Sequence, residues 1–281
     1  MLLLSYRYRR VLGYIMGFVL FYAPFALFQR TILFLLGYTY NPTIHTLCFR
    51  IPIEHIFSNR FFSMGEVAVL GTIILFLVAF FFGPLFCGRL CPTGAITEYV
   101  SLLIPSRFKI NWGKYIPIAP LRYGFLLGFL ISPLIGGYLA CSYCNYFVFD
   151  LLLNYCLWGY TVAFSSSLLL TLILWFVVFG LFTQGGRGFC NFFCPVGAIQ
   201  NLLYFFGCKT TLAWKLQIVD KRCILCKQCV HHCPMLALNF MEKQIKRNQH
   251  HCILCMQCMN NCPVQAIYYS KTTEMRNKDE Q

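Results

Sequence analysis

The strongest constraint on the fold is a cysteine pattern near the C-terminus that occurs twice. Four cysteines with the spacing C-x2-C-x2-C-x3-C-P begin at Cys223, and the same spacing begins again at Cys252. Nine of fifteen aligned positions are identical, which indicates an internal duplication. Each run is typical of [4Fe–4S] ligation, in which three closely spaced thiolates on a tight loop bind one cluster.

The fourth cysteine of each run cannot close its own site without strain, so we expect it to bind the other cluster. This predicts two ligand sets, which are Cys223, Cys226, Cys229 and Cys262 for cluster 1, and Cys252, Cys255, Cys258 and Cys233 for cluster 2. Zinc is the alternative, because C-x2-C pairs also form zinc knuckles. Short strands are expected after each proline, over Leu236–Phe240 and Ala266–Ser270. Four histidines flank the runs and are interpreted as surface residues, the alternative being an influence on cluster potential: His231, His232, His250 and His251.

A second duplication carries the shorter motif C-x3-C-P. Residues Phe86–Ile96 and Phe189–Ile199 match at seven of eleven positions. Cysteines at i and i+4 share one face of a helical turn, so each motif can offer two thiolates to one site. We expect a third metal site, with a shared [4Fe–4S] cluster as the favoured form, from Cys87, Cys91, Cys190 and Cys194. A redox-active dithiol is the next candidate, and small apolar side chains that cap helices are the structural alternative.

The rest of the chain is unusually apolar. Hydrophobic residues make up 58% of the sequence and charged residues 11%, which excludes an ordinary soluble enzyme or a disordered chain. Four uncharged stretches approach the ~20 residues that a membrane-spanning helix needs. They are Val11–Phe28, Val67–Phe86, Tyr123–Ala140 and Ala163–Phe182. The sequence therefore predicts four transmembrane helices, arranged as two parallel repeats that each end in C-x3-C-P.

The basic residues predict the orientation of these spans. With four spans, one side collects 20 of the 23 Lys and Arg residues and the whole net charge of +14. Positive residues gather on the cytoplasmic side, so both termini are expected there, in a multi-pass protein of the bacterial cytoplasmic (inner) membrane. This use of the charge leaves no reason to expect a nucleic-acid partner. Thiols on that side stay reduced and persist as metal ligands or free groups.

A different cysteine pair is expected on the outer face. Cys141 and Cys144 have C-x2-C spacing, and with Cys48 and Cys156 they make an even set of four. A redox dithiol, structural disulfides and a metal pair are equally open interpretations. Bound haem is not expected, because no histidine lies within a predicted span.

The two C-x3-C-P motifs, followed by the two-cluster tail, resemble the membrane polyferredoxins of the NapH, NosR and MauN type. The resemblance implies a mainly α membrane protein with a small α+β bacterial two-cluster ferredoxin domain. We expect a four-span domain over residues 1–215, a ferredoxin domain over 216–272 and a polar tail over 273–281.

The resemblance also implies a function. The protein would be the electron-transfer component of a quinol dehydrogenase, which exchanges electrons between the quinone pool and a respiratory reductase chain. Its expected partners are the lipid bilayer, a quinone or quinol and another redox protein subunit. The alternative is an iron–sulfur redox factor for the assembly, maturation or regulation of a respiratory enzyme, with Cys141 and Cys144 as its output.

Overall fold

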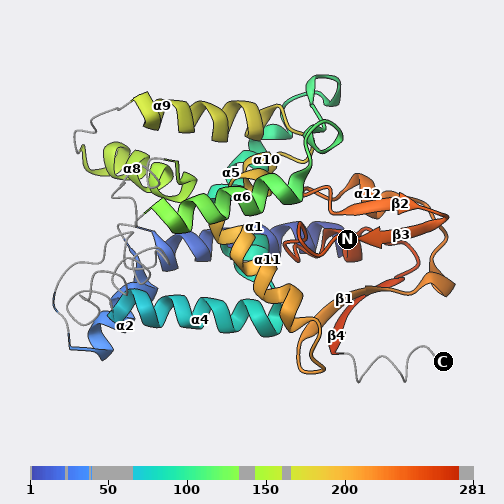
Figure 1. Ribbon diagram of the computed structural model, residues 1–281, viewed down its shortest axis with the longest axis horizontal. Coiled ribbons are helices and arrows are strands. Elements are labelled where there is room, and N and C mark those ends of the chain that lie inside the picture. Colours follow the sequence, from blue (N-terminus) through green and yellow to red (C-terminus); the bar gives the residue numbers. More distant parts are fainter. Residues whose placement is uncertain are drawn as a thin grey trace.

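The computed structural model describes residues 2–22, 25–37, 39, 66–132, 143–159 and 166–271. Long helices run along the molecule and the strands gather at one end (Figure 1). The helical elements before the first strand are α1 Leu2–Phe21, α2 Leu27–Leu35, α4 Glu66–Phe82, η2 Phe86–Leu90, α5 Pro92–Ser101, η3 Ser106–Phe108, η4 Trp112–Lys114, α6 Ile118–Ile131, α8 Asn145–Trp158, α9 Ser166–Leu172, η6 Ile173–Leu181, α10 Gly188–Phe192 and α11 Pro195–Gly207. The remaining elements are β1 Trp214–Ile218, η7 Asp220–Arg222, α12 Gln228–His231, β2 Leu238–Met241, β3 Gln244–Arg247, α13 Gln257–Asn260 and β4 Ile267–Lys271.

The prediction of four transmembrane helices is wrong for the chain that the structure describes. None of its described helices is both long enough and apolar enough to cross a membrane. α1 has 20 residues but includes three arginines, and α4 has 17. α4 stops at Phe82 because Gly83 follows it with a positive φ of 76° and Pro84 comes next. The multi-pass inner-membrane localisation was built on these spans and is corrected with them.

The described helices within the other three expected spans also differ from the prediction. The first is interrupted at Ala26, whose φ of 44° separates α1 from α2. α6 ends at Ile131, and α9 with η6 covers only 166–181. The remaining parts of those two expected spans, within 133–140 and 163–165, lie outside the described residues. The apolar composition therefore did not predict the length of the helices.

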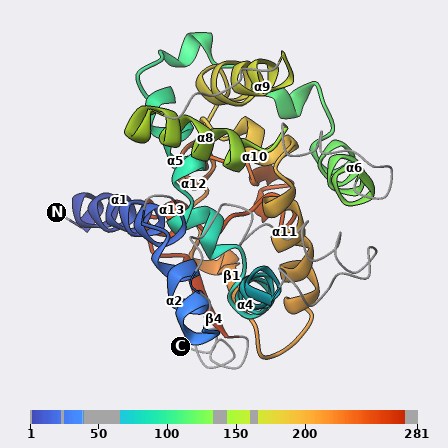
Figure 2. The same cartoon turned by 90° about the vertical axis from the view of Figure 1, so that its left-hand side faces the viewer.

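The helices that follow the two C-x3-C-P motifs occupy the middle of the molecule. Seen along its length, α4, α6 and α9 lie at the periphery, and α5, α10 and α11 lie between them (Figure 2). α11 packs against both α4 and α6, and α5 packs against η6. The apolar core on this side includes Trp175, Phe179 and Phe192. The two motifs are thereby brought together at the centre of the fold.

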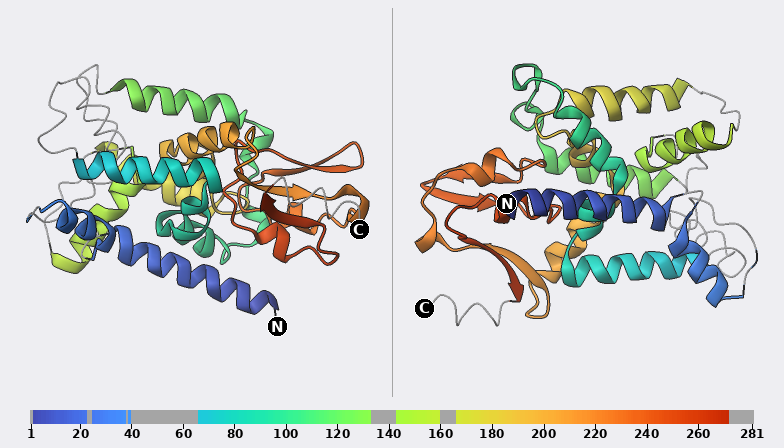
Figure 3. Two further views of the ribbon diagram at one scale, coloured as in Figure 1. Left: turned by 90° about the horizontal axis from the view of Figure 1, so that it is seen from below. Right: turned by 180° about the vertical axis from the view of Figure 1, so that it is seen from behind.

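The strands form two antiparallel pairs at the other end (Figure 3). β1 pairs with β4 from Trp214↔Lys271 to Ile218↔Ile267, and β2 pairs with β3. The predicted strands are observed as β2 and β4, shifted by one or two residues. Their partners β1 and β3 were not predicted. The β2–β3 turn has positive φ at both central residues, Glu242 and Lys243, as in a type I′ turn.

The internal duplication is visible in the backbone. Three pairs of non-glycine residues with positive φ, each pair 29 positions apart, mark the two runs: Leu225 and Leu254, Lys227 and Met256, Leu236 and Gln265. Lys227 directly precedes the four-residue helix α12, and Met256 directly precedes the equivalent helix α13. Both cysteine runs therefore fold as the same local structure.

Candidate iron–sulfur sites

Twelve of the predicted ligands line three separate cavities, four thiols to each. Cavity 1 is lined by Cys223, Cys226, Cys229 and Cys262. Cavity 2 is lined by Cys233, Cys252, Cys255 and Cys258. Cavity 3 is lined by Cys87, Cys91, Cys190 and Cys194. Each set is the one that the sequence predicted, including the exchange of Cys233 and Cys262 between the two runs.

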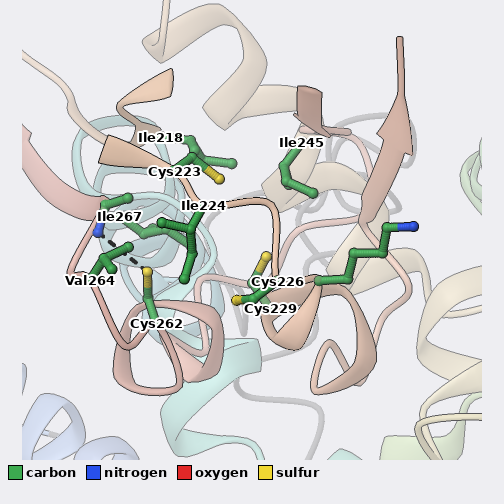
Figure 4. A pocket seen from close by; sticks show the side chains of 11 residues that line it. Ile218, Cys223, Ile224, Cys226, Cys229, Ile245, Cys262, Val264 and Ile267 are labelled. Carbon is green, nitrogen blue, oxygen red and sulfur yellow. Dashed lines mark hydrogen bonds between the residues drawn. The ribbon is translucent and has the colours of Figure 1, made fainter. Parts of the chain in front are cut away.

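Cavity 1 shows how the exchange arises (Figure 4). Cys223, Cys226 and Cys229 come from the first run, and Cys262 approaches from the second, with Ile218 and Ile267 as apolar neighbours. The backbone N–H of Ala266 donates to Cys262 Sγ at 3.2 Å, and the equivalent N–H of Ala237 donates to Cys233 Sγ at 3.3 Å. Such N–H groups stabilise a thiolate and so favour metal ligation.

In cavity 3 the second cysteine of each motif lies at the start of a helix. Cys91 is the N-cap residue of α5 and Cys194 that of α11, and a proline follows each. The positive end of the helix dipole, with its unpaired N–H groups, stabilises negative charge at both thiols. The first cysteines belong to other short helices, Cys87 to η2 and Cys190 to α10. The predicted i, i+4 pair on one helical turn is therefore replaced by a helix junction, yet all four thiols reach one cavity.

Burial disfavours the charged form of these thiols. It raises the pKa of Cys87, Cys190 and Cys194 in cavity 3, and the neighbouring thiols raise it further. In cavity 2, burial and the thiols of Cys255 and Cys252 raise the pKa of Cys233 to about 12. Thiols of this kind become ligands only when a cation replaces their protons.

Positive charge lies close to cavities 2 and 3. Glu98 forms ion pairs with Arg10 at 2.7 Å and with Arg187 at 2.5 Å, and all three side chains are buried. Arg187 Nη1 also donates to the Cys87 carbonyl at 2.8 Å. Although burial opposes the charge of Arg187, Tyr14, Glu98 and Cys190 together raise its pKa well above the usual value. The sequence did not indicate this network, because a count of charged residues does not show which of them pair.

The residues fit [4Fe–4S] clusters by the chemistry of their donors. Four thiols around one cavity are the ligand set that such clusters use. Backbone N–H groups donate to a sulfur at cavities 1 and 2, and buried cations lie near cavities 2 and 3. No group of three or more His, Cys, Asp or Glu side chains in the described ranges is arranged to hold a metal ion. Ligation by these twelve cysteines therefore stays a prediction. The structure shows that each expected set of four thiols lines one cavity.

Other predicted residues have different outcomes. Cys48, Cys141 and the tail 273–281 lie outside the described residues. Cys144 is the N-cap residue of α8, and Cys156 is an exposed residue of the same helix. His251 was interpreted as a surface residue but is buried, and its ring contacts Asn191 at 3.0 Å.

Comparisons with known proteins agree on the cofactor. Residues 64–111 and 167–212 match the family described as a 4Fe-4S binding domain, and residues 215–263 match the 4Fe-4S dicluster domain. The first family covers both C-x3-C-P motifs, and the second covers the C-terminal runs. No solved structure matches the chain.

Three relatives illustrate the similarity. An uncharacterized protein of Methanocaldococcus jannaschii is 27% identical over 69% of this chain and 75% of its own length. The ferredoxin-type protein NapH of Escherichia coli is 31% identical, over 60% of this chain and 54% of its own length. The methylamine utilization ferredoxin-type protein MauN of Methylobacillus flagellatus is 29% identical, over 66% and 59%. The chain thus spans between about half and three quarters of these relatives. The predicted resemblance is confirmed: the chain is similar to the ferredoxin-type proteins NapH and MauN. It is an iron–sulfur electron-transfer protein, and [4Fe–4S] clusters are its cofactors.

Proposed function

We propose that the chain passes electrons along three [4Fe–4S] clusters, one in each cavity. The observation that carries the proposal is the division of twelve cysteines among three cavities with four thiols each. When bound, such clusters supply one-electron transfer at potentials set by net charge, hydrogen bonds to sulfur and solvent exposure. The chain supplies the thiolates, the buried surroundings and the spacing between sites.

Packing supports a linear order with cavity 2 in the middle. Ile253 lines both cavity 2 and cavity 3, and it packs in one buried cluster with Cys87 and Cys255. Cavities 1 and 2 lie on the two sides of the duplicated fold, whose shared core contains Cys229 and Cys258. Cavity 1 therefore forms one end of the proposed chain of sites, and cavity 3 the other.

Exposure supports cavity 1 as the end that meets a protein partner. Cys226 is exposed, and the neighbouring Ile224 has an exposed fraction of 61%. Cys87 of cavity 3 and Cys255 of cavity 2 are buried. A second redox protein that docks over Ile224 would come closest to the ligands of cavity 1. The resemblance adds the finer proposal that a quinone or quinol is the other redox partner.

Iron analysis of cavity-specific variants tests the proposal. We expect about twelve irons per chain after anaerobic purification, as three cubanes require. Each of three double variants should lose about four of them: C226S/C229S, C255S/C258S and C91S/C194S. C156S, which changes an exposed cysteine outside the cavities, is the matched control and should keep all of them.

Each alternative predicts a distinct result. Eight irons that C91S/C194S leaves unchanged would remove the cluster from cavity 3, and zinc in place of iron would refute the proposal altogether. Anaerobic addition of a quinol then tests the finer partner. Reduction of the clusters is monitored by electron paramagnetic resonance (EPR). Reduced spectra after addition of the quinol would support a quinol donor, and unchanged spectra would exclude it.

A further inference from the structure

Arg122 is a buried guanidinium that lacks a carboxylate partner in the described part of the chain. It belongs to α6 and has an exposed fraction of 1%. Its Nη2 donates to Asn201 Oδ1 at 2.7 Å, but its Nε and Nη1 have no hydrogen-bond partner among the described residues. An uncompensated buried charge strongly destabilises a fold. The fold should therefore supply negative charge close to this side chain.

The two other buried arginines among the described residues do have such a partner. Arg10 and Arg187 share Glu98, and the pKa of Arg187 is raised. For Arg122 the balance is opposite: burial lowers its pKa, and the nearby thiols, with Cys194 first, only partly offset this. The protein groups around Arg122 thus leave its charge undercompensated.

Cavity 3 is the place where the missing negative charge would lie. Gly197 lines this cavity, and a Cβ built on it would lie 2.9 Å from Arg122 Nη2 and 3.9 Å from Cys194 Sγ. The guanidinium therefore lies against the cavity wall at a glycine that leaves room for it. Cys87 and Cys190, which line the same cavity, also raise the pKa of Arg122.

The repeat places a second guanidinium in the equivalent position. Gly94 holds the same place in the first motif as Gly197 in the second. A Cβ on Gly94 would lie 2.8 Å from Arg187 Nη1 and 3.1 Å from Cys190 Sγ. Each C-P-x-G segment thus admits one arginine beside cavity 3. Only Arg187 of the two is paired with a carboxylate.

We propose that Arg122 is the charge-compensating residue for an anionic [4Fe–4S] cluster in cavity 3 and raises its reduction potential. The inference rests on the proposed function, which assigns a cluster to that cavity. A cluster held by four thiolates is negatively charged, and one-electron reduction adds one further negative charge without loss of any group. A fixed positive charge nearby stabilises the reduced form more than the oxidised form.

Redox titration followed by EPR measures this effect. In R122Q the potential of one cluster should shift to a more negative value, with the other two unchanged and about twelve irons retained. R122K keeps the charge and should restore most of the potential. R107Q, which removes an exposed arginine that contacts Phe108, is the control and should shift none of them.

The possible results separate the inference from the proposed function. Twelve irons and unchanged potentials in R122Q would overturn the role of Arg122 and leave the three clusters intact. Eight irons in the unmodified chain would overturn the cluster in cavity 3, and the inference with it. If R122Q loses four irons but R122K keeps them, the charge holds the cluster, which supports the inference. Loss in both variants would assign Arg122 a role in shape only and overturn it.

Discussion

Glu98 is a single carboxylate on which three separate segments converge. Arg10 comes from α1, Arg187 precedes α10, and Gln257 of α13 donates to Glu98 Oε1 at 3.3 Å. E98Q would leave two buried guanidinium groups with a neutral amide. Removal of one partner from a buried pair costs about 3–5 kcal/mol. We expect the free energy of unfolding, measured with denaturant, to fall by that amount.

The control is E242Q, which breaks the exposed pair of Glu242 with Lys246. Exposed pairs contribute about 0–1 kcal/mol, so E242Q should change little. An equal loss in the two variants would contradict the special role of Glu98.

The same carboxylate makes a prediction about pH. Burial alone would raise the pKa of Glu98, but Arg187 and Arg10 outweigh it and hold the pKa below the usual value. The unfolded chain, with a pKa of about 4.3, therefore takes up the proton first as the pH falls. The stabilisation is complete above about pH 4.3 and is lost as the pH drops from there through the folded pKa. The unfolding free energy of E98Q should lack this component of the acid slope, and an unchanged slope would refute it.

At the scale of elements, Gly88 is the point where η2 packs against the loop that carries Ile253 and Cys255. A Cβ on Gly88 would lie 2.2 Å from the Ile253 carbonyl oxygen and 3.0 Å from the Cys255 nitrogen. G88A must therefore push η2 away from the loop that carries Cys252 and Cys255. Overpacking of this kind costs about 1–3 kcal/mol. We expect G88A to unfold at lower denaturant concentration.

G128A on α6 is the matched control. Its added Cβ would meet nothing within 4 Å, so relief of the glycine's helical cost should stabilise the chain by up to about 1 kcal/mol. If G88A is as stable as the unmodified chain, the close contact between η2 and the loop is not needed for the fold.

Elements that depend on local signals could be predicted from the sequence, whereas contacts between distant residues could not. The repeated cysteine spacing predicted the thiol sets, and β2 and β4 follow the prolines closely. The apolar stretches suggested spans, but their helices end at positive-φ positions such as Ala26 and Gly83, which hydropathy does not register. The contacts of Glu98 and Arg122 join residues more than 70 positions apart in the sequence. Examples are Arg10 with Glu98 and Arg122 with Asn201.

At the scale of the whole molecule, the three cavities differ in the exposure of their thiols. Cavity 1 lies in the strand-bearing end and has the exposed Cys226 among its ligands, with Ile224 also exposed. Cavity 3 lies among the central elements and has no exposed thiol, and it shares the lining residue Ile253 with cavity 2. The proposed sites are therefore ordered from an accessible end to a protected one.

This order predicts stepwise removal of metal. A chelator reaches iron at an exposed thiolate directly, whereas iron at a buried site leaves only after local opening, which costs free energy. We expect an anaerobic, oxidant-assisted chelator to release about four irons in a fast phase and about eight in a slower one, by the count of three cubanes. EPR should show that the cluster lost first is the one absent from C226S/C229S. That variant should lack the fast phase, whereas C91S/C194S should keep it and lose part of the slow phase. Release of all iron in one phase, or a fast phase that persists in C226S/C229S, would contradict the proposed order.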